Sequence, residues 1–162
     1  MSTKTILLGQ LAASYDENGW FSCLKFAIKG VTAEQADWKA QGADNSIREI
    51  INHLNYYNNT YLERFRGNDY EYTLPDNDAT FDEGEGNTWE DEVQRFETIM
   101  DGWREEIEKA DDSKFDEMAP PRNETKWKVV ISNIIAHAAH HGGQIVLLRK
   151  LQGSWDSSDG VS

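Results

Sequence analysis

The sequence has little cysteine, little proline and no long apolar run. Its 162 residues include three prolines and one cysteine, Cys23, so an intramolecular disulfide is excluded. No stretch reaches the ~20 apolar residues that a membrane-spanning helix needs. The first twenty residues lack the basic and apolar regions of a secretory signal. These absences predict a cytoplasmic protein that does not enter membranes.

Basic residues are also scarce. The chain has 16 Lys and Arg against 29 Asp and Glu, a formal net charge of −13. Residues 67–124 hold 20 acidic and 5 basic side chains, so this segment carries −15 and the rest of the chain +2. A field of this sign repels nucleic acid and anionic lipid, and we expect neither as a partner. The acidic segment itself is expected to be a solvated surface.

Strand-like alternation and internal repeats are absent, whereas four stretches show the apolar spacing of amphipathic helices. Between the second and third stretches lies a polar segment of about twenty residues, which is long enough to be a crossover. We therefore predict an all-α four-helix bundle with one long crossover between helices two and three, in the order up-down-down-up. The predicted helices cover about 5–29, 46–66, 88–110 and 126–152, and the crossover covers 68–87.

Signals at the ends of these stretches support the assignment. Ser46 with Glu49 three residues later has the pattern of a capping box, and Thr88 is a second capping residue. Gly30 and Gly67 follow the first and second stretches, where glycine commonly ends a helix. We expect residues 1–155 to form a single domain and residues 156–162 to form a disordered polar tail.

Three of the four histidines lie within "HAAHHGGQI", residues 137–145. Steps of three and four residues along the last helix, from Trp127 to Leu151, predict a core face with His137, His141 and Gln144 in its middle. His137 and His141 are four residues apart on one face, so two imidazole nitrogens can reach one ion at ~2.0–2.1 Å.

The remaining histidine, His53, lies on the second predicted helix at the edge of its apolar face, near Tyr57. A third imidazole from a facing helix would complete a three-histidine metal site with open coordination positions, which is the catalytic pattern. Buried histidines that only make hydrogen bonds are the alternative. His140 points away from this face and is expected beside the site or on the surface.

Gly142 and Gly143 follow His141 directly. Each costs a helix interior ~1 kcal/mol relative to alanine. The missing side chains can leave space for a substrate or permit a close contact with another helix, and the sequence does not decide between these two uses.

The residues around the histidines resemble the DinB family, the DinB/YfiT-like metalloenzymes. "SIREIINHLNYYNNTYLERFRG" is similar to the family's first-histidine helix, and "WKVVISNIIAHAAHHGGQIVLLRKLQGSW" is similar to its closing helix with H-x-x-x-H-x-G-Q-I. "VTAEQADWKAQGADNSI" also fits, so the likeness covers about residues 5–155. The resemblance implies a four-helix bundle that forms a homodimer. It also implies one divalent ion, zinc or nickel, held by His53, His137 and His141, with Gly143 and Gln144 matching the motif's G-Q.

Some relatives in that family transfer low-molecular-weight thiols, and an ion held by three imidazoles can hold a thiol as a thiolate near neutral pH. Our leading hypothesis is a metal-dependent S-transferase that joins such a thiol to a small electrophile. Cys23 is read as a core residue, so the thiol would be a cosubstrate. His140, Gln144 and Tyr57 are the candidates for the pocket around the ion.

Two other functions stay open at this point. One is metal-dependent hydrolysis, and the other is a metal-binding dimeric stress protein without turnover. The negative net charge disfavours an anionic thiol unless the pocket mouth is locally basic. The basic residues that can supply such a mouth are Arg48, Arg64, Arg66, Lys126 and Lys128.

Overall fold

The structure, a computed structural model, describes residues 2–82, 84 and 86–159, and its regular elements in these ranges are all helical. The one β-type pairing there is an isolated bridge between Met118 and Lys126. The α-helices are α1 (Thr3–Tyr15), α2 (Leu24–Ala27), α3 (Ala33–Asp37), α4 (Ile47–Phe65), α5 (Trp89–Lys109) and α6 (Trp127–Leu151). Short 3-10 helices are η1 (Asp78–Thr80), η2 (Asp112–Asp116) and η3 (Ser157–Asp159).

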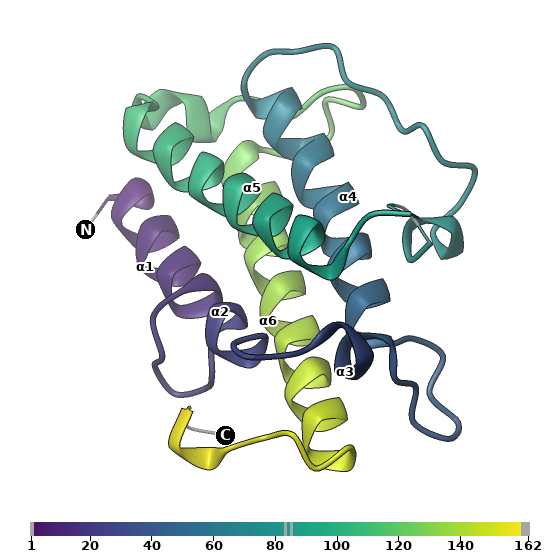
Figure 1. The fold of residues 1–162 in the computed structure, drawn as a ribbon. Helices are drawn as coiled ribbons and strands as arrows, with labels where there is room; N and C mark the ends of the chain where they lie inside the picture. Colours follow the sequence, from purple (N-terminus) through teal and green to yellow (C-terminus); the bar gives the residue numbers. More distant parts are fainter. Residues whose placement is uncertain (1, 83, 85, 160–162) are drawn as a thin grey trace.

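The long helices α1, α4, α5 and α6 pack on one another around a single core (Figure 1). The connection from α4 to α5 leaves the upper end of α4 in Figure 1 and passes down the outside of the molecule to the start of α5. The 3-10 helix η1 lies within this connection and packs against α4. The largest fully buried side chains are Trp103, Tyr15, Phe65, Phe96 and Phe115.

The start of α4 follows the predicted capping pattern. The Ser46 backbone N–H donates to Glu49 Oε2 at 2.6 Å, and the Glu49 backbone N–H donates to Ser46 Oγ at 3.2 Å. The helix ends before Gly67, whose φ of +91° is a conformation that glycine adopts without strain. Thr88 caps α5 in the same way, with Asp91 as its partner. These two helices therefore begin where local side chains satisfy their first backbone donors.

The prediction of one helix over residues 5–29 is wrong. The chain leaves the helix after Tyr15, and Asn18 Oδ1 accepts a hydrogen bond from the Cys23 backbone N–H at 3.0 Å. Asparagine competes with the helix for backbone partners in this way, and Gly19 follows it. Cys23 is the N-terminal flanking residue of α2 and is fully buried, which raises the pKa of its thiol. It therefore has the surroundings of a core residue, as the sequence predicted.

The predicted core face of α6 is displaced from the observed one. Ala138, Gly142 and Ile145 are buried, whereas Gln144 and Leu151 are exposed. The helix packs against α1 and α2 on one side and α4 on another, so its buried face is wider than a single row and is centred beside the predicted row. His137 accordingly lies at the border of the core and is only half-buried.

The two glycines of α6 have different surroundings. A Cβ on Gly142 would lie 3.5 Å from Leu24 Cγ, an ordinary contact distance, so Gly142 marks the place where α2 packs on α6. A Cβ on Gly143 would meet nothing within 4 Å, and Gly143 is exposed. Of the two uses that the sequence left open, Gly142 therefore permits a close contact with another helix.

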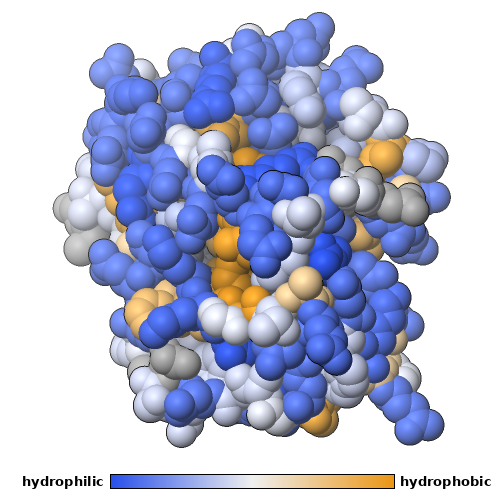
Figure 2. Space-filling view, in the orientation of Figure 1, coloured by the Kyte–Doolittle hydropathy of each residue, from blue (hydrophilic) through white to orange (hydrophobic). Residues whose placement is uncertain are grey.

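The face shown in Figure 2 is mainly hydrophilic, with a narrow apolar strip near its centre. Within residues 2–82, 84 and 86–159, no helix combines the length and the apolar character needed to cross a membrane. The segment predicted to be a disordered tail includes η3, and residues 160–162 lie outside the described residues.

Candidate metal centre

Three of the four histidines meet between α4 and α6. His53 comes from the middle of α4, and His137 and His141 come from consecutive turns of α6. His137 Nε2 lies 3.0 Å from His53 Nε2 and 2.9 Å from His141 Nε2. The three ligand nitrogens all lie within 4.8 Å of one another. The structure thus brings together the three residues that the sequence singled out.

The long connection between α4 and α5 holds the ring of His53 in place. His53 Nδ1 lies 2.6 Å from Thr80 Oγ1, and the Thr80 hydroxyl donates to the Asn77 carbonyl at 2.6 Å. Because the hydroxyl hydrogen is used in that bond, Thr80 Oγ1 accepts from His53 Nδ1–H. Phe81 stacks on the His53 ring, with centroids 4.1 Å apart and planes 8° apart. Side chains of this connection therefore set both the orientation and the tautomer of His53.

The side chain of Gln144 plays the same part for His141. His141 Nδ1 lies 2.6 Å from Gln144 Oε1, one turn further along α6. An amide oxygen only accepts, so His141 Nδ1 carries the hydrogen and its Nε2 carries the lone pair. Gln144 is exposed and lies off the buried face, yet it still orients one of the clustered imidazoles.

This arrangement of hydrogens fits a cation. His53 and His141 both turn an Nε2 lone pair towards His137 Nε2, which can donate a hydrogen to only one of them. Two nitrogens bound tetrahedrally to one zinc ion at ~2.0–2.1 Å lie roughly 3.3 Å apart, close to the two distances found here. Hydrogen bonding of the outer imidazole nitrogen to an oxygen is also the usual arrangement for histidine ligands. The residues present therefore match the requirements of a divalent ion.

The environment of the cluster keeps the imidazoles neutral. Burial, followed by the neighbouring imidazoles, lowers the pKa of His53 to about 3 and that of His137 to about 4. Burial also lowers the pKa of His141, although its bond to Gln144 opposes the shift. Neutral imidazole is the form that binds a metal, so the cluster is in its ligating form at neutral pH.

A cavity of about 430 Å³ opens beside the cluster. His53 and His137 form part of its wall, so the cavity reaches two of the three clustered imidazoles. Tyr57 also lines it and packs against His53 with ring centroids 5.0 Å apart, and the Tyr57 hydroxyl donates to Asn77 Oδ1 at 3.2 Å. The remaining wall includes apolar Val130 and Ile134.

His140 is not part of the cluster. It is exposed, its Nε2 lies 3.3 Å from Gln144 Nε2, and its ring centroid lies 5.2 Å from that of His141. Sequence reasoning missed Thr80, Asn77 and Phe81, which support the site from the long connection. The unusual length of that connection was the only signal for them, and it singled out no particular residue.

A family comparison covers the segment that holds this cluster. The family model described as the DinB superfamily matches residues 24–145, about three quarters of the chain, and the matched segment contains all three clustered histidines. No curated protein matches the chain.

Proposed function

The chain belongs to the DinB superfamily, and from this we propose that it is a metal-dependent S-transferase that joins a low-molecular-weight thiol to a small electrophile in the cytoplasm. The single observation that carries the proposal is the convergence of three neutral imidazoles, two of which, His53 and His137, line an open cavity. A closed structural site would surround its ion with four protein ligands, whereas three leave a position for a reactant.

The chain's own residues have distinct parts in this proposal. His53, His137 and His141 would hold one divalent ion, zinc or nickel, and Thr80 and Gln144 would keep the ligands oriented. The bound ion would supply a Lewis acid that lowers the pKa of a cosubstrate thiol. Val130 and Ile134 would give the reactants apolar contacts in the cavity, and the Tyr57 side chain bounds the space beside the ion.

The overall reaction needs no further redox partner. The thiol gives its proton to solvent, its sulfur forms a bond to an electrophilic carbon, and the leaving group departs with the bonding electrons. Cys23 is buried away from solvent, which supports an external thiol rather than an internal one.

Metal binding is tested by elemental analysis of single histidine variants. We expect His53→Ala, His137→Ala and His141→Ala to lose the ion and His140→Ala to keep it, since His140 lies outside the cluster. Equal loss in His140→Ala and His141→Ala would show that the ligand assignment is wrong.

Catalysis is tested by following thiol consumption with a model electrophile, with and without metal. We expect metal-dependent conjugation in the wild type and His140→Ala, and none in His137→Ala. Cleavage of esters or amides without thiol would instead indicate a hydrolase. A metal-loaded protein that is inactive in both assays would indicate a metal-binding protein without turnover.

We also propose that the four long helices follow the order up-down-down-up and that the protein forms a homodimer. The path of the α4–α5 connection supports the helix order (Figure 1). Exposed apolar side chains support the dimer, since Leu147 and Leu151 lie one turn apart on α6 at 56% and 60% exposure and Trp20 is fully exposed. Light scattering tests the dimer, and a monomer at micromolar concentration would refute it.

A further inference from the structure

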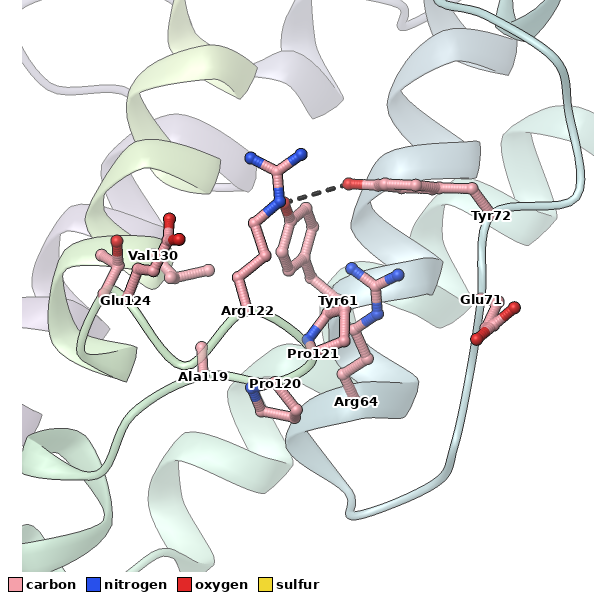
Figure 3. Close-up of a pocket in the computed structure, with 11 residues that line it drawn as sticks. Tyr61, Arg64, Glu71, Tyr72, Ala119, Pro120, Pro121, Arg122, Glu124 and Val130 are labelled. Carbon is pink, nitrogen blue, oxygen red and sulfur yellow. Dashed lines mark hydrogen bonds between the residues drawn. The ribbon is translucent and has the colours of Figure 1, made fainter.

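A second cavity of about 560 Å³, whose lining Figure 3 shows, shares wall residues with the histidine cavity. Tyr61, Thr125 and Val130 line both cavities, so the two spaces are neighbours along one wall. The second cavity is bounded by α4, the connection after it and the segment that precedes α6. A molecule that reaches the histidines can therefore extend into this second space.

Arg64 brings a buried positive charge to the second cavity. Only 6% of the residue is exposed, and its Nε donates to the Tyr70 carbonyl at 2.7 Å. The guanidinium lies over two aromatic rings, 4.6 Å from the Tyr72 centroid and 5.3 Å from the Tyr61 centroid. Among the described residues, no carboxylate pairs with it and its terminal nitrogens have no hydrogen-bond partner. Arg64 is thus held rigidly with two donor groups left for a ligand.

The other basic residues suggested by the sequence are already engaged with carboxylates. Arg48 pairs with Asp37, Arg66 pairs with Glu63 and Glu106, and Lys126 and Lys128 both pair with Asp116. Arg64 is the exception in that group.

A second arginine reaches the same cavity from a segment that looks acidic in the sequence. Arg122 lines the cavity and has no ion pair among the described residues (Figure 3). Two carboxylates, Glu71 and Glu124, line the cavity as well, but both are exposed and solvent screens them more than it screens the buried Arg64. The inner part of the cavity is therefore positive in a protein whose net charge is −13.

A phenol adds a neutral donor between the two cavities. The Tyr72 hydroxyl donates to Tyr61 Oη at 3.1 Å, so the hydrogen of the Tyr61 hydroxyl is left for another acceptor. Burial raises the pKa of Tyr61 to about 12, so this hydroxyl stays protonated.

We propose that Arg64, Arg122 and Tyr61 form a subsite for the carboxylate of a small organic reactant. The planar guanidinium donors match a carboxylate, and the aromatic faces hold Arg64 ready for it. The carboxylate can belong to the thiol or to the electrophile. Binding of the carboxylate at this subsite is independent of the proposed function. Placing the reactive end of the same molecule at the histidines rests on the proposed function.

Binding is tested first in chelated protein, where catalysis plays no part. N-acetylcysteine carries a carboxylate and N-acetylcysteine amide does not, so nuclear magnetic resonance titrations with both compounds isolate the charge. Iodoacetate and iodoacetamide form the corresponding pair for the electrophile, and their KM values are compared in metal-loaded protein with a common thiol. In that reaction the sulfur displaces iodide and the thiol proton passes to solvent.

The decisive variant is Arg122→Gln, because this exposed side chain lies outside the helices and its loss should not unfold the protein. We expect Arg122→Gln to weaken the binding of the acidic compound of at least one pair about tenfold, because one charge-assisted hydrogen bond is worth about that much. Binding of the neutral compound should stay within about twofold of the wild type. Arg66→Gln is the matched control, since Arg66 is paired elsewhere. Glu124→Gln should have the opposite effect and strengthen the binding of the acidic compound.

A variant of the buried arginine completes the test. Arg64→Lys keeps the charge but loses the planar donors, so we expect weaker carboxylate binding with unchanged circular dichroism. Equal binding of acidic and neutral members by the wild type, or equal weakening of both in Arg122→Gln, would refute the subsite. Carboxylate-selective binding without turnover would uphold the subsite and refute the proposed function, and turnover without charge preference would do the reverse.

Discussion

Replacing Thr80 with valine removes one hydroxyl and keeps the volume of the side chain. In the native site the hydroxyl oxygen accepts from His53 Nδ1–H at 2.6 Å. Thr80 is fully buried and His53 is 3% exposed, so water cannot easily take over this bond. The variant therefore tests whether the long α4–α5 connection supports the metal centre.

The size of the effect follows from the bond that is lost. An unpaired buried N–H costs about 1–3 kcal/mol. His53 can avoid that cost by moving its hydrogen to Nε2, but the lone pair facing the other two imidazoles is then lost. Either way the ion binds more weakly, and removing an outer partner of a ligand typically lowers metal affinity about 10- to 100-fold. We expect Thr80→Val to fall in that range.

The assay is a competition titration of zinc against a coloured chelator at about pH 7.5. The matched control is Thr60→Val on α4, because Thr60 is also buried and its hydroxyl donates to a backbone carbonyl, that of Tyr56, at 2.9 Å. Thr60 lies outside the histidine cluster, so its variant should bind zinc within about threefold of the wild type. If Thr80→Val binds zinc as tightly as the control, the orienting role of Thr80 is refuted.

Three further predictions concern stability. Chelation at about pH 7.5 should lower the melting temperature while circular dichroism still shows a helical protein, since the ion binds only the folded state and the core has its own apolar packing; complete unfolding would make the ion structural. In chelated protein the melting temperature should fall as pH drops from about 6.5 towards 4. Burial lowers the pKa of His53 to about 3 and that of His137 to about 4, so in this pH range the unfolded chain binds more protons than the folded protein. A constant melting temperature from pH 7 to 5 would contradict this. Gly143→Ala should stabilise α6 by about 0.5–1 kcal/mol in urea unfolding, since a Cβ at this position meets no atom within 4 Å. Gly102→Ala should destabilise the protein, because its Cβ would lie 2.9 Å from a Leu62 methyl. A change in unfolding free energy of the same sign in both variants would show that the difference in packing is unimportant.

The sequence by itself determined those features that depend on local patterns. Apolar spacing predicted the long helices α4, α5 and α6, and Ser46 with Glu49 predicted the start of α4, because capping and helix periodicity act within a few residues. The i,i+4 spacing of His137 and His141 predicted a shared face for the same reason. His53 was recognised as their partner only because a third imidazole was needed and the chain has a single candidate on another predicted helix.

The tertiary structure decided everything that depends on distant parts of the chain. The break after Tyr15 follows from Asn18 bonding to the backbone of Cys23, a choice that apolar periodicity does not report. The orientation of His53 comes from Thr80, 27 residues away, and only packing shows that a polar connection supplies it. Arg64 and Arg122 line the second cavity and have no carboxylate partner among the described residues, unlike Arg48, Arg66, Lys126 and Lys128. Pairing depends on which side chains meet in space. The sequence offered Arg64 only as one of five basic candidates, and it did not offer Arg122.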